Sequence, residues 1–168
     1  MSRAGTVDGL AFARGREEVS GSMGIDELPR LADSGCEAAT LQYTLRGGES
    51  AKGRPSLTLA VTGQARLVCQ RCLEPLEIPL AATCELELAE TLAEIDGADD
   101  DAVDRVLATR AMAIADLVED EAILALPMVP MHERCETGIT KADPAPATAF
   151  AALAGLRKGG AGPKGSPQ

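Results

Sequence analysis

Hydrophobic and polar residues alternate with a period of two over two long stretches in the first half of the chain. The first stretch runs from Ser56 to Cys69 and the second from Leu76 to Leu88. Alternation of this length is typical of strands that have one face on a core and the other in water. The intervening run QRCLEP therefore predicts the turn of one long β-hairpin, with Cys69 ending the first strand and Cys72 in the turn.

Residues 39–46 alternate in the same way and predict a strand before the hairpin. Three consecutive strands of this kind should form an antiparallel meander. We therefore expect an α+β fold: an antiparallel β-meander with a long hairpin, packed by one principal helix. The expected domain covers residues 1–136. Residues 137–168 are rich in Ala, Gly and Pro and predict an extended, partly disordered and flexible tail with a short apolar segment near 148–157.

The principal helix is predicted from Asp116 onward. Asp116 precedes two apolar residues, and Glu119 follows three positions later, as in a capping box. Pro127 and Pro130 should end the helix. Its apolar surface should lie on the sheet, which predicts that four residues are buried together: Leu59, Val61, Ile78 and Leu124.

The chain has 168 residues, enough for one domain with a substantial core. Its only aromatic residues are Phe12, Tyr43 and Phe150, so base stacking on aromatic platforms is disfavoured as a way of binding RNA. Five cysteines without a secretory signal, and the absence of an apolar run of about 20 residues, favour a cytoplasmic protein with reduced thiols and no membrane segment.

The net charge of −10 is unevenly distributed. Residues 73–104 contain eleven acidic residues and no basic one. We expect the acidic run 85–104 to be a solvated strand edge and a mobile loop, since its spacing matches no calcium loop. A locally basic stretch could contact RNA phosphate, or could simply be a solvated face, and it consists of Arg46, Lys52, Arg54, Arg66 and Arg71.

Two pairs of metal-ligating residues share the same spacing. Cys69 and Cys72 form the first pair, and His132 and Cys135 form the second, beyond the predicted helix end. Three thiolates and one imidazole suit a closed tetrahedral zinc site, with no position left for catalysis. The alternative is that Cys69 is a core residue and His132 an exposed loop residue. Thiol–disulfide exchange has less support, because Cys69 ends a strand and does not begin a helix.

Three segments resemble one protein family. The runs LVCQRCLEPLEIPL and DLVEDEAILALPMVPMHERC, followed by TAFAALAGLRKG, are similar in order and spacing to the large ribosomal RNA subunit accumulation protein (YceD) family. The resemblance covers roughly residues 56–158.

The resemblance implies a bacterial, non-enzymatic ribosome-biogenesis factor that supports synthesis, processing or accumulation of large-subunit ribosomal RNA. Its partners would be that RNA or its precursor particle, contacted directly or through a ribosomal protein. The alternative is a zinc- or thiol-dependent enzyme that acts on RNA or on disulfides.

Overall fold

The computed structural model describes residues 5–96 and 104–135. Their elements follow one another as β1 (Thr6–Val7), α1 (Gly9–Gly15), β2 (Glu18–Gly24), the 3-10 helix η1 (Ile25–Glu27), α2 (Pro29–Asp33), β3 (Ala38–Glu49), β4 (Pro55–Val68), β5 (Pro75–Ala89), α3 (Leu92–Asp96), β6 (Asp104–Leu107), β7 (Met112–Ala113) and α4 (Ile114–Ala125). The tail expected at residues 137–168, with its apolar segment, lies outside the described residues. In the described part of the chain, no helix is both long and apolar enough to cross a membrane.

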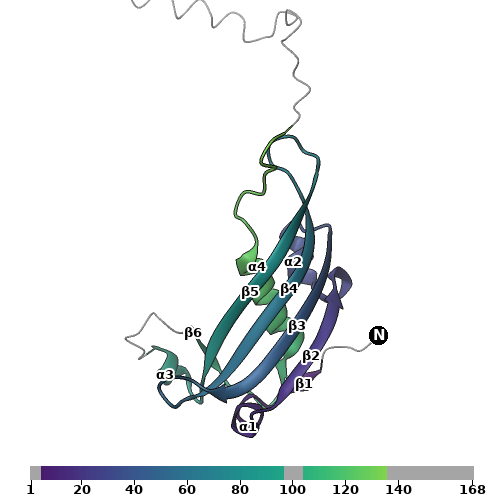
Figure 1. The fold of residues 1–168 in the computed structure, drawn as a ribbon. Coiled ribbons are helices and arrows are strands. Elements are labelled where there is room, and N and C mark those ends of the chain that lie inside the picture. Colours follow the sequence, from purple (N-terminus) through teal and green to yellow (C-terminus); the bar gives the residue numbers. More distant parts are fainter. Residues whose placement is uncertain (1–4, 97–103, 136–168) are drawn as a thin grey trace, which may run out of the picture. The chain divides into compact units, whose positions relative to one another are not determined.

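The predicted α+β fold is confirmed. Five strands form one sheet in the order β2-β3-β4-β5-β6 (Figure 1). Strands β3, β4 and β5 are the expected meander, and β2 adds to it antiparallel to β3. Strand β6 pairs parallel to β5, and the short strands β1 and β7 pair with each other.

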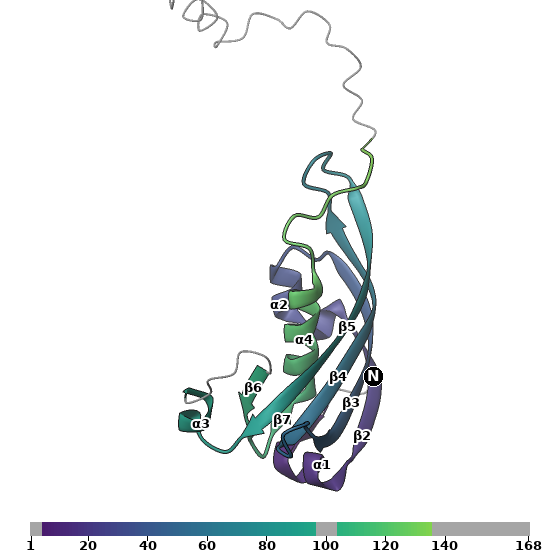
Figure 2. The same cartoon turned by 60° about the vertical axis from the view of Figure 1, so that its left-hand side comes forward.

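One face of the sheet is the core. On β4 the side chains of this face are buried, as the alternation predicted: Leu57, Leu59, Val61, Ala65 and Leu67. Helices α1, α2 and α4 lie on this side of the sheet (Figure 2). Helix α1 approaches β3 closely at Gly47, where an added Cβ would lie 2.2 Å from the carbonyl oxygen of Phe12. Only glycine permits that approach.

The principal helix begins earlier than predicted. Helix α4 starts at Ile114, so Asp116 lies in its first turn and is not its cap. Glu119 is 3% exposed, and its carboxylate accepts hydrogen bonds from the backbone N–H of Leu31 at 3.0 Å and from Nε of Arg30 at 2.8 Å. The capping-box interpretation was therefore wrong, because this carboxylate is used to hold α2 against α4.

The face that α4 presents to the sheet also differs from the prediction. Its buried apolar positions are Ile114, Val118 and Ala122, which recur every four residues. Leu124 is 79% exposed, so the expectation that it is buried is wrong. At 3.6 residues per turn, Leu124 lies on the opposite side of the helix from Ala122. Since Leu117, Ile123 and Leu124 are apolar but lie outside this stripe, the sequence of α4 alone did not identify the side that packs.

This orientation can be tested by two matched substitutions. Leu59→Ala should lower the free energy of unfolding by about 2–5 kcal/mol, because Leu59 is fully buried and its truncation leaves a cavity. Leu124→Ala should change that free energy by less than about 0.5 kcal/mol. Urea denaturation measures both, and similar losses in the two variants would contradict the orientation of α4.

A buried ion pair joins β5 to β6. Glu87 has no exposed surface and lies opposite Arg105 in the parallel register. The hydroxyl of Ser50 donates to one carboxylate oxygen at 2.8 Å, and Nε of Arg105 donates to the other at 3.1 Å. The hydrogen bond from Ser50 lowers the pKa of Glu87, and burial raises it. The hydrogen bond and the charge of Arg105 lower it further, so the pKa of Glu87 is below its ordinary value. Within the acidic run, Glu87 is thus a structural residue and not a solvated one.

Candidate metal centre at the hairpin tip

The turn between β4 and β5 places the first cysteine pair. Cys69 follows the end of β4, and its N–H donates to the carbonyl of Glu74 at 2.9 Å. The N–H of Leu73 donates back to the carbonyl of Cys69, also at 2.9 Å. Leu73 has a φ of 63°, in the left-handed region that favours glycine. These bonds close a tight turn around Cys72, as the sequence predicted.

The second pair reaches the same place because the chain turns back after α4. Pro127 and Pro130 follow the end of the helix, and the carbonyl of Pro130 accepts the N–H of Gln70 at 2.9 Å. The N–H of His132 lies 3.4 Å from Sγ of Cys69. The loop after α4 therefore docks on the hairpin tip (Figure 1), as the zinc-site interpretation requires.

The four candidate ligands form one compact group. The ligand atoms of Cys69, Cys72, His132 and Cys135 all lie within 4.8 Å of one another. Sγ of Cys69 is 3.6 Å from Sγ of Cys135, and Sγ of Cys72 is 3.4 Å from Nδ1 of His132. A tetrahedral zinc ion with ordinary bond lengths would separate two sulfurs by about 3.8 Å and sulfur from nitrogen by about 3.5 Å. The arrangement is compatible with a structural zinc.

His132 is oriented by a contact on the far side of its ring. Its Nε2 lies 3.1 Å from the carbonyl oxygen of Pro75. Because a carbonyl only accepts, Nε2 carries the proton and Nδ1 presents its lone pair toward Cys72. Metal-binding histidines are commonly fixed in this way through their second nitrogen.

The surroundings of the group favour thiolates. Burial raises the pKa of Cys69, but backbone N–H groups of Cys72, His132 and Arg71 outweigh it and lower that pKa to about 5. Nε of Arg71 lies 2.9 Å from Sγ of Cys135, and its terminal nitrogen donates to the carbonyl of His132 at 2.9 Å. Three thiolates and one Zn²⁺ would leave a net charge of −1, which this guanidinium offsets.

The other two cysteines lie outside the group. Cys36 is buried, and Cys84 is half-buried on β5. Burial, followed by contact with Glu121, raises the pKa of Cys84 to about 12, so its thiol stays protonated. Cys69 has the low pKa of a reactive thiol but no exposed surface. A thiolate in that position suits a metal ligand better than a nucleophile.

The predicted basic contacts do not form one surface. Arg66 lies at the tip end of the sheet, where it pairs with Glu77 across the hairpin at 2.7 Å, and Arg71 lies in the tip itself. Arg46 pairs in register with Thr58, and Arg54 lies in the turn between β3 and β4, both toward the other end. The structure thus brings Arg66 and Arg71 together with the cysteines and separates them from Arg46 and Arg54.

The sequence analysis did not identify the apolar residues around the tip. Four large apolar side chains there are exposed by 52% or more: Leu73, Met128, Val129 and Met131. A groove of about 670 Å³ runs between the loop at residues 126–130 and the end of β4. The apolar run at residues 126–131, LPMVPM, was the available signal for three of these four residues. We call these four side chains, with Arg66 and Arg71, the tip surface.

Comparison with known proteins places the chain in a family. A family described as "Large ribosomal RNA subunit accumulation protein YceD" matches residues 57–157. A Haemophilus influenzae protein with that same name is 35% identical over 142 residues, which are 78% of this chain and 78% of the relative. No solved structure matches the chain. The matched region spans the long hairpin, the candidate metal centre and α4, and the chain therefore belongs to the YceD family of large ribosomal RNA subunit accumulation proteins.

Proposed function

We propose that this protein is a non-enzymatic, zinc-stabilised factor that supports the accumulation of large-subunit ribosomal RNA in bacteria. The family and the name of the Haemophilus influenzae relative support the RNA component of this function. The partner would be large-subunit RNA or its precursor particle, contacted directly or through a ribosomal protein.

The non-enzymatic part of the proposal rests on the ligand group, which leaves no open position on a metal. Three cysteines and one histidine would fill all four positions of a tetrahedral zinc ion, whereas catalytic zinc sites keep one position for water or substrate. The buried position of Cys69 also disfavours thiol chemistry. Both observations support a structural role for the metal over the alternative of a zinc- or thiol-dependent enzyme.

The tip surface is the proposed contact with the partner. Exposed apolar side chains gathered in one place are typical of interaction sites. The guanidinium groups of Arg66 and Arg71 each bond to an anionic partner within this chain, Glu77 and Cys135, and each keeps further N–H donors that suit phosphate or an acidic protein surface. A zinc ion would hold the hairpin turn and the loop after α4 together, so that both contribute to one rigid surface.

Leu73→Gly tests this contact without disturbing the fold. The substitution removes a side chain that is 75% exposed, at a position whose positive φ glycine adopts more easily than leucine. We expect less co-sedimentation with large-subunit precursors and less mature large-subunit RNA, with unchanged or slightly higher thermal stability. Leu92→Ser is the matched control, since Leu92 is 64% exposed in α3 at the other end of the sheet.

Normal RNA levels and full co-sedimentation in Leu73→Gly would contradict the tip as the contact. Arg66→Gln then separates RNA from protein as the partner. If Arg66 contacts RNA phosphate, the salt dependence of binding should fall by a slope of about 0.7–0.9 in this variant. If Arg66→Gln leaves this slope unchanged while Leu73→Gly weakens binding, the partner is a protein on the precursor particle.

A further inference from the structure

Strand β2 is a free edge of the sheet. It pairs with β3 on one side, and no strand of the described residues pairs with its other side. The carbonyl of Glu17 accepts the N–H of Gly47, which sets the alternation of the antiparallel ladder. Val19, Gly21 and Met23 therefore bond to β3, while Ser20 and Ser22 direct their N–H and C=O groups outward.

The central part of the edge, residues 19–23, lacks the features that usually protect such strands. Natural edge strands are commonly interrupted by lysine, proline or a bulge, which prevent pairing with another chain. Residues 19–23 read Val-Ser-Gly-Ser-Met, and their register with β3 is continuous. Within residues 5–96 and 104–135, no hydrogen bond satisfies the outward backbone groups of Ser20 and Ser22. The edge can accept a further strand.

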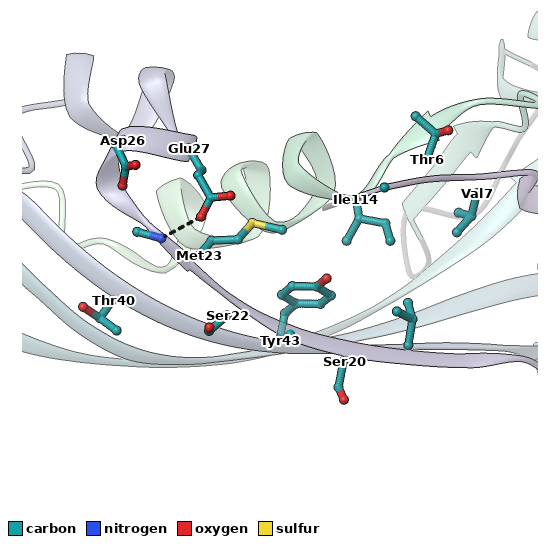
Figure 3. A pocket seen from close by; sticks show the side chains of 14 residues that line it. Thr6, Val7, Ser20, Ser22, Met23, Asp26, Glu27, Thr40, Tyr43 and Ile114 are labelled. Atoms are coloured by element: carbon teal, nitrogen blue, oxygen red, sulfur yellow. Dashed lines mark hydrogen bonds between the residues drawn. The ribbon is translucent and has the colours of Figure 1, made fainter. Parts of the chain in front are cut away.

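A cavity of about 1010 Å³ lies beside this edge, on the core side of the sheet. Figure 3 shows Met23, Tyr43 and Ile114 pointing into the same space from β2, β3 and the start of α4. All three are nearly buried, so they form an apolar floor. The ring of Tyr43 lies over Gly21, where an added Cβ would be 2.7 Å from the tyrosine oxygen. That hydroxyl has no hydrogen-bond partner among the described residues.

One end of the cavity is acidic. Asp26 and Glu27 line it, next to Gly24 at the end of β2. One oxygen of Glu27 accepts the N–H of Gly24 at 3.2 Å. In the described part of the chain neither carboxylate forms an ion pair with a cationic side chain. A positively charged group of a ligand would therefore complement these two carboxylates.

We propose that β2 is the docking edge for an extended, basic segment of a partner protein. The segment adds a strand to the sheet through Ser20 and Ser22. Running parallel to β2, it places an apolar side chain over Met23 and Tyr43, and a lysine or arginine two positions toward its own C-terminus beside Asp26 and Glu27. Strand addition of this kind takes affinity from backbone hydrogen bonds and specificity from alternate side chains.

The charges argue against a second copy of this chain as the occupant. Antiparallel pairing of β2 with itself about Gly21 would bring Glu18 of one copy toward Gly24 of the other. In that register the residue opposite Asp26 is Arg16, which already pairs with Glu49, and the two copies would each bring a net charge of −10. A basic peptide meets no such repulsion. The proposal concerns a surface other than the tip and does not depend on zinc.

Two synthetic peptides test the proposal, TVTLTKT and TVTLTET, each blocked at both termini. As a strand, each presents Val, Leu and either Lys or Glu on one face. We expect TVTLTKT to bind more tightly and to shift the amide NMR signals of Ser20 and Ser22. Asp26→Asn with Glu27→Gln should weaken its binding by roughly two- to thirtyfold, the effect of losing two exposed charge pairs, and remove the preference over TVTLTET.

Ser22→Pro provides the backbone control. Its N–H points away from β3, so proline blocks the edge and leaves the ladder with β3 intact. This variant should lose peptide binding while keeping its thermal stability. Equal binding of the two peptides, shifts confined to other residues, or no shift at millimolar peptide would overturn the proposal. A dimer in sedimentation that Ser22→Pro dissociates would also overturn it and assign the edge to a second copy.

Discussion

Purified protein should carry close to one zinc ion per chain, bound by Cys69, Cys72, His132 and Cys135. The physical reason is that the four ligand atoms already lie within 4.8 Å of one another and that a backbone carbonyl fixes the ring of His132. Metal binding therefore requires little rearrangement beyond the loss of thiol protons. Elemental analysis of protein prepared without chelator measures the stoichiometry.

Single substitutions should separate ligands from neighbours. Cys69→Ser should lose the metal, whereas Cys84→Ser should retain it, because Cys84 lies outside the group. Arg71→Gln should lower zinc affinity by about 10–100-fold, since its guanidinium contacts Sγ of Cys135 and offsets the charge of the thiolates. Competition with a chelator of known affinity gives these values.

Removal of the metal should loosen the tip and leave the sheet intact. Hydrogen exchange should accelerate at residues 69–74 and 126–135, while β3 and the adjoining parts of β4 and β5 keep their protection, because the sheet has its own apolar core. Protein that stays metal-free after growth with added zinc would contradict the site. So would Cys69→Ser protein that binds zinc as tightly as the unmodified chain.

Arg105→Ala should lower the free energy of unfolding by about 3–5 kcal/mol at neutral pH. The substitution leaves the carboxylate of Glu87 without exposed surface and without its cation, which is far costlier than the loss of an exposed pair. The matched control is Arg46→Ala. Arg46 pairs with Glu18 on the surface, and its loss should cost at most about 1 kcal/mol. Urea denaturation compares the two variants.

The pH dependence follows from the lowered pKa of Glu87. Its folded value lies below its ordinary value of 4.5, so the charged carboxylate contributes its full stability above that pH. The contribution is lost as the pH falls through the folded pKa. The stability difference between the unmodified chain and Arg105→Ala should therefore shrink below pH 4.5.

A double substitution checks that the uncompensated charge is the cause. Glu87→Gln with Arg105→Leu should be less destabilising than Arg105→Ala alone, because no buried charge remains and Gln can still accept the Ser50 hydrogen bond. If the double variant loses as much stability as Arg105→Ala, the charge is not the cause, and packing around Arg105 accounts for the effect.

The sequence by itself determined the central hairpin and the candidate metal centre. Alternation over β4 and β5 determined the face that is buried, because a shift of one residue would expose every apolar side chain. The end of the first alternation places Cys69 beside the turn. The spacing of His132 and Cys135 after two prolines was enough to predict a loop that returns to it.

Only the tertiary structure decided where individual side chains point on elements with ambiguous patterns. Helix α4 has apolar residues on more than one side, so the exposure of Leu124 depends on how the helix packs. The buried roles of Glu87 and Glu119 depend on Arg105 and α2, which lie far away in the sequence. Local periodicity reports which face of an element is apolar, whereas burial of a charge depends on a partner that only the folded chain brings near.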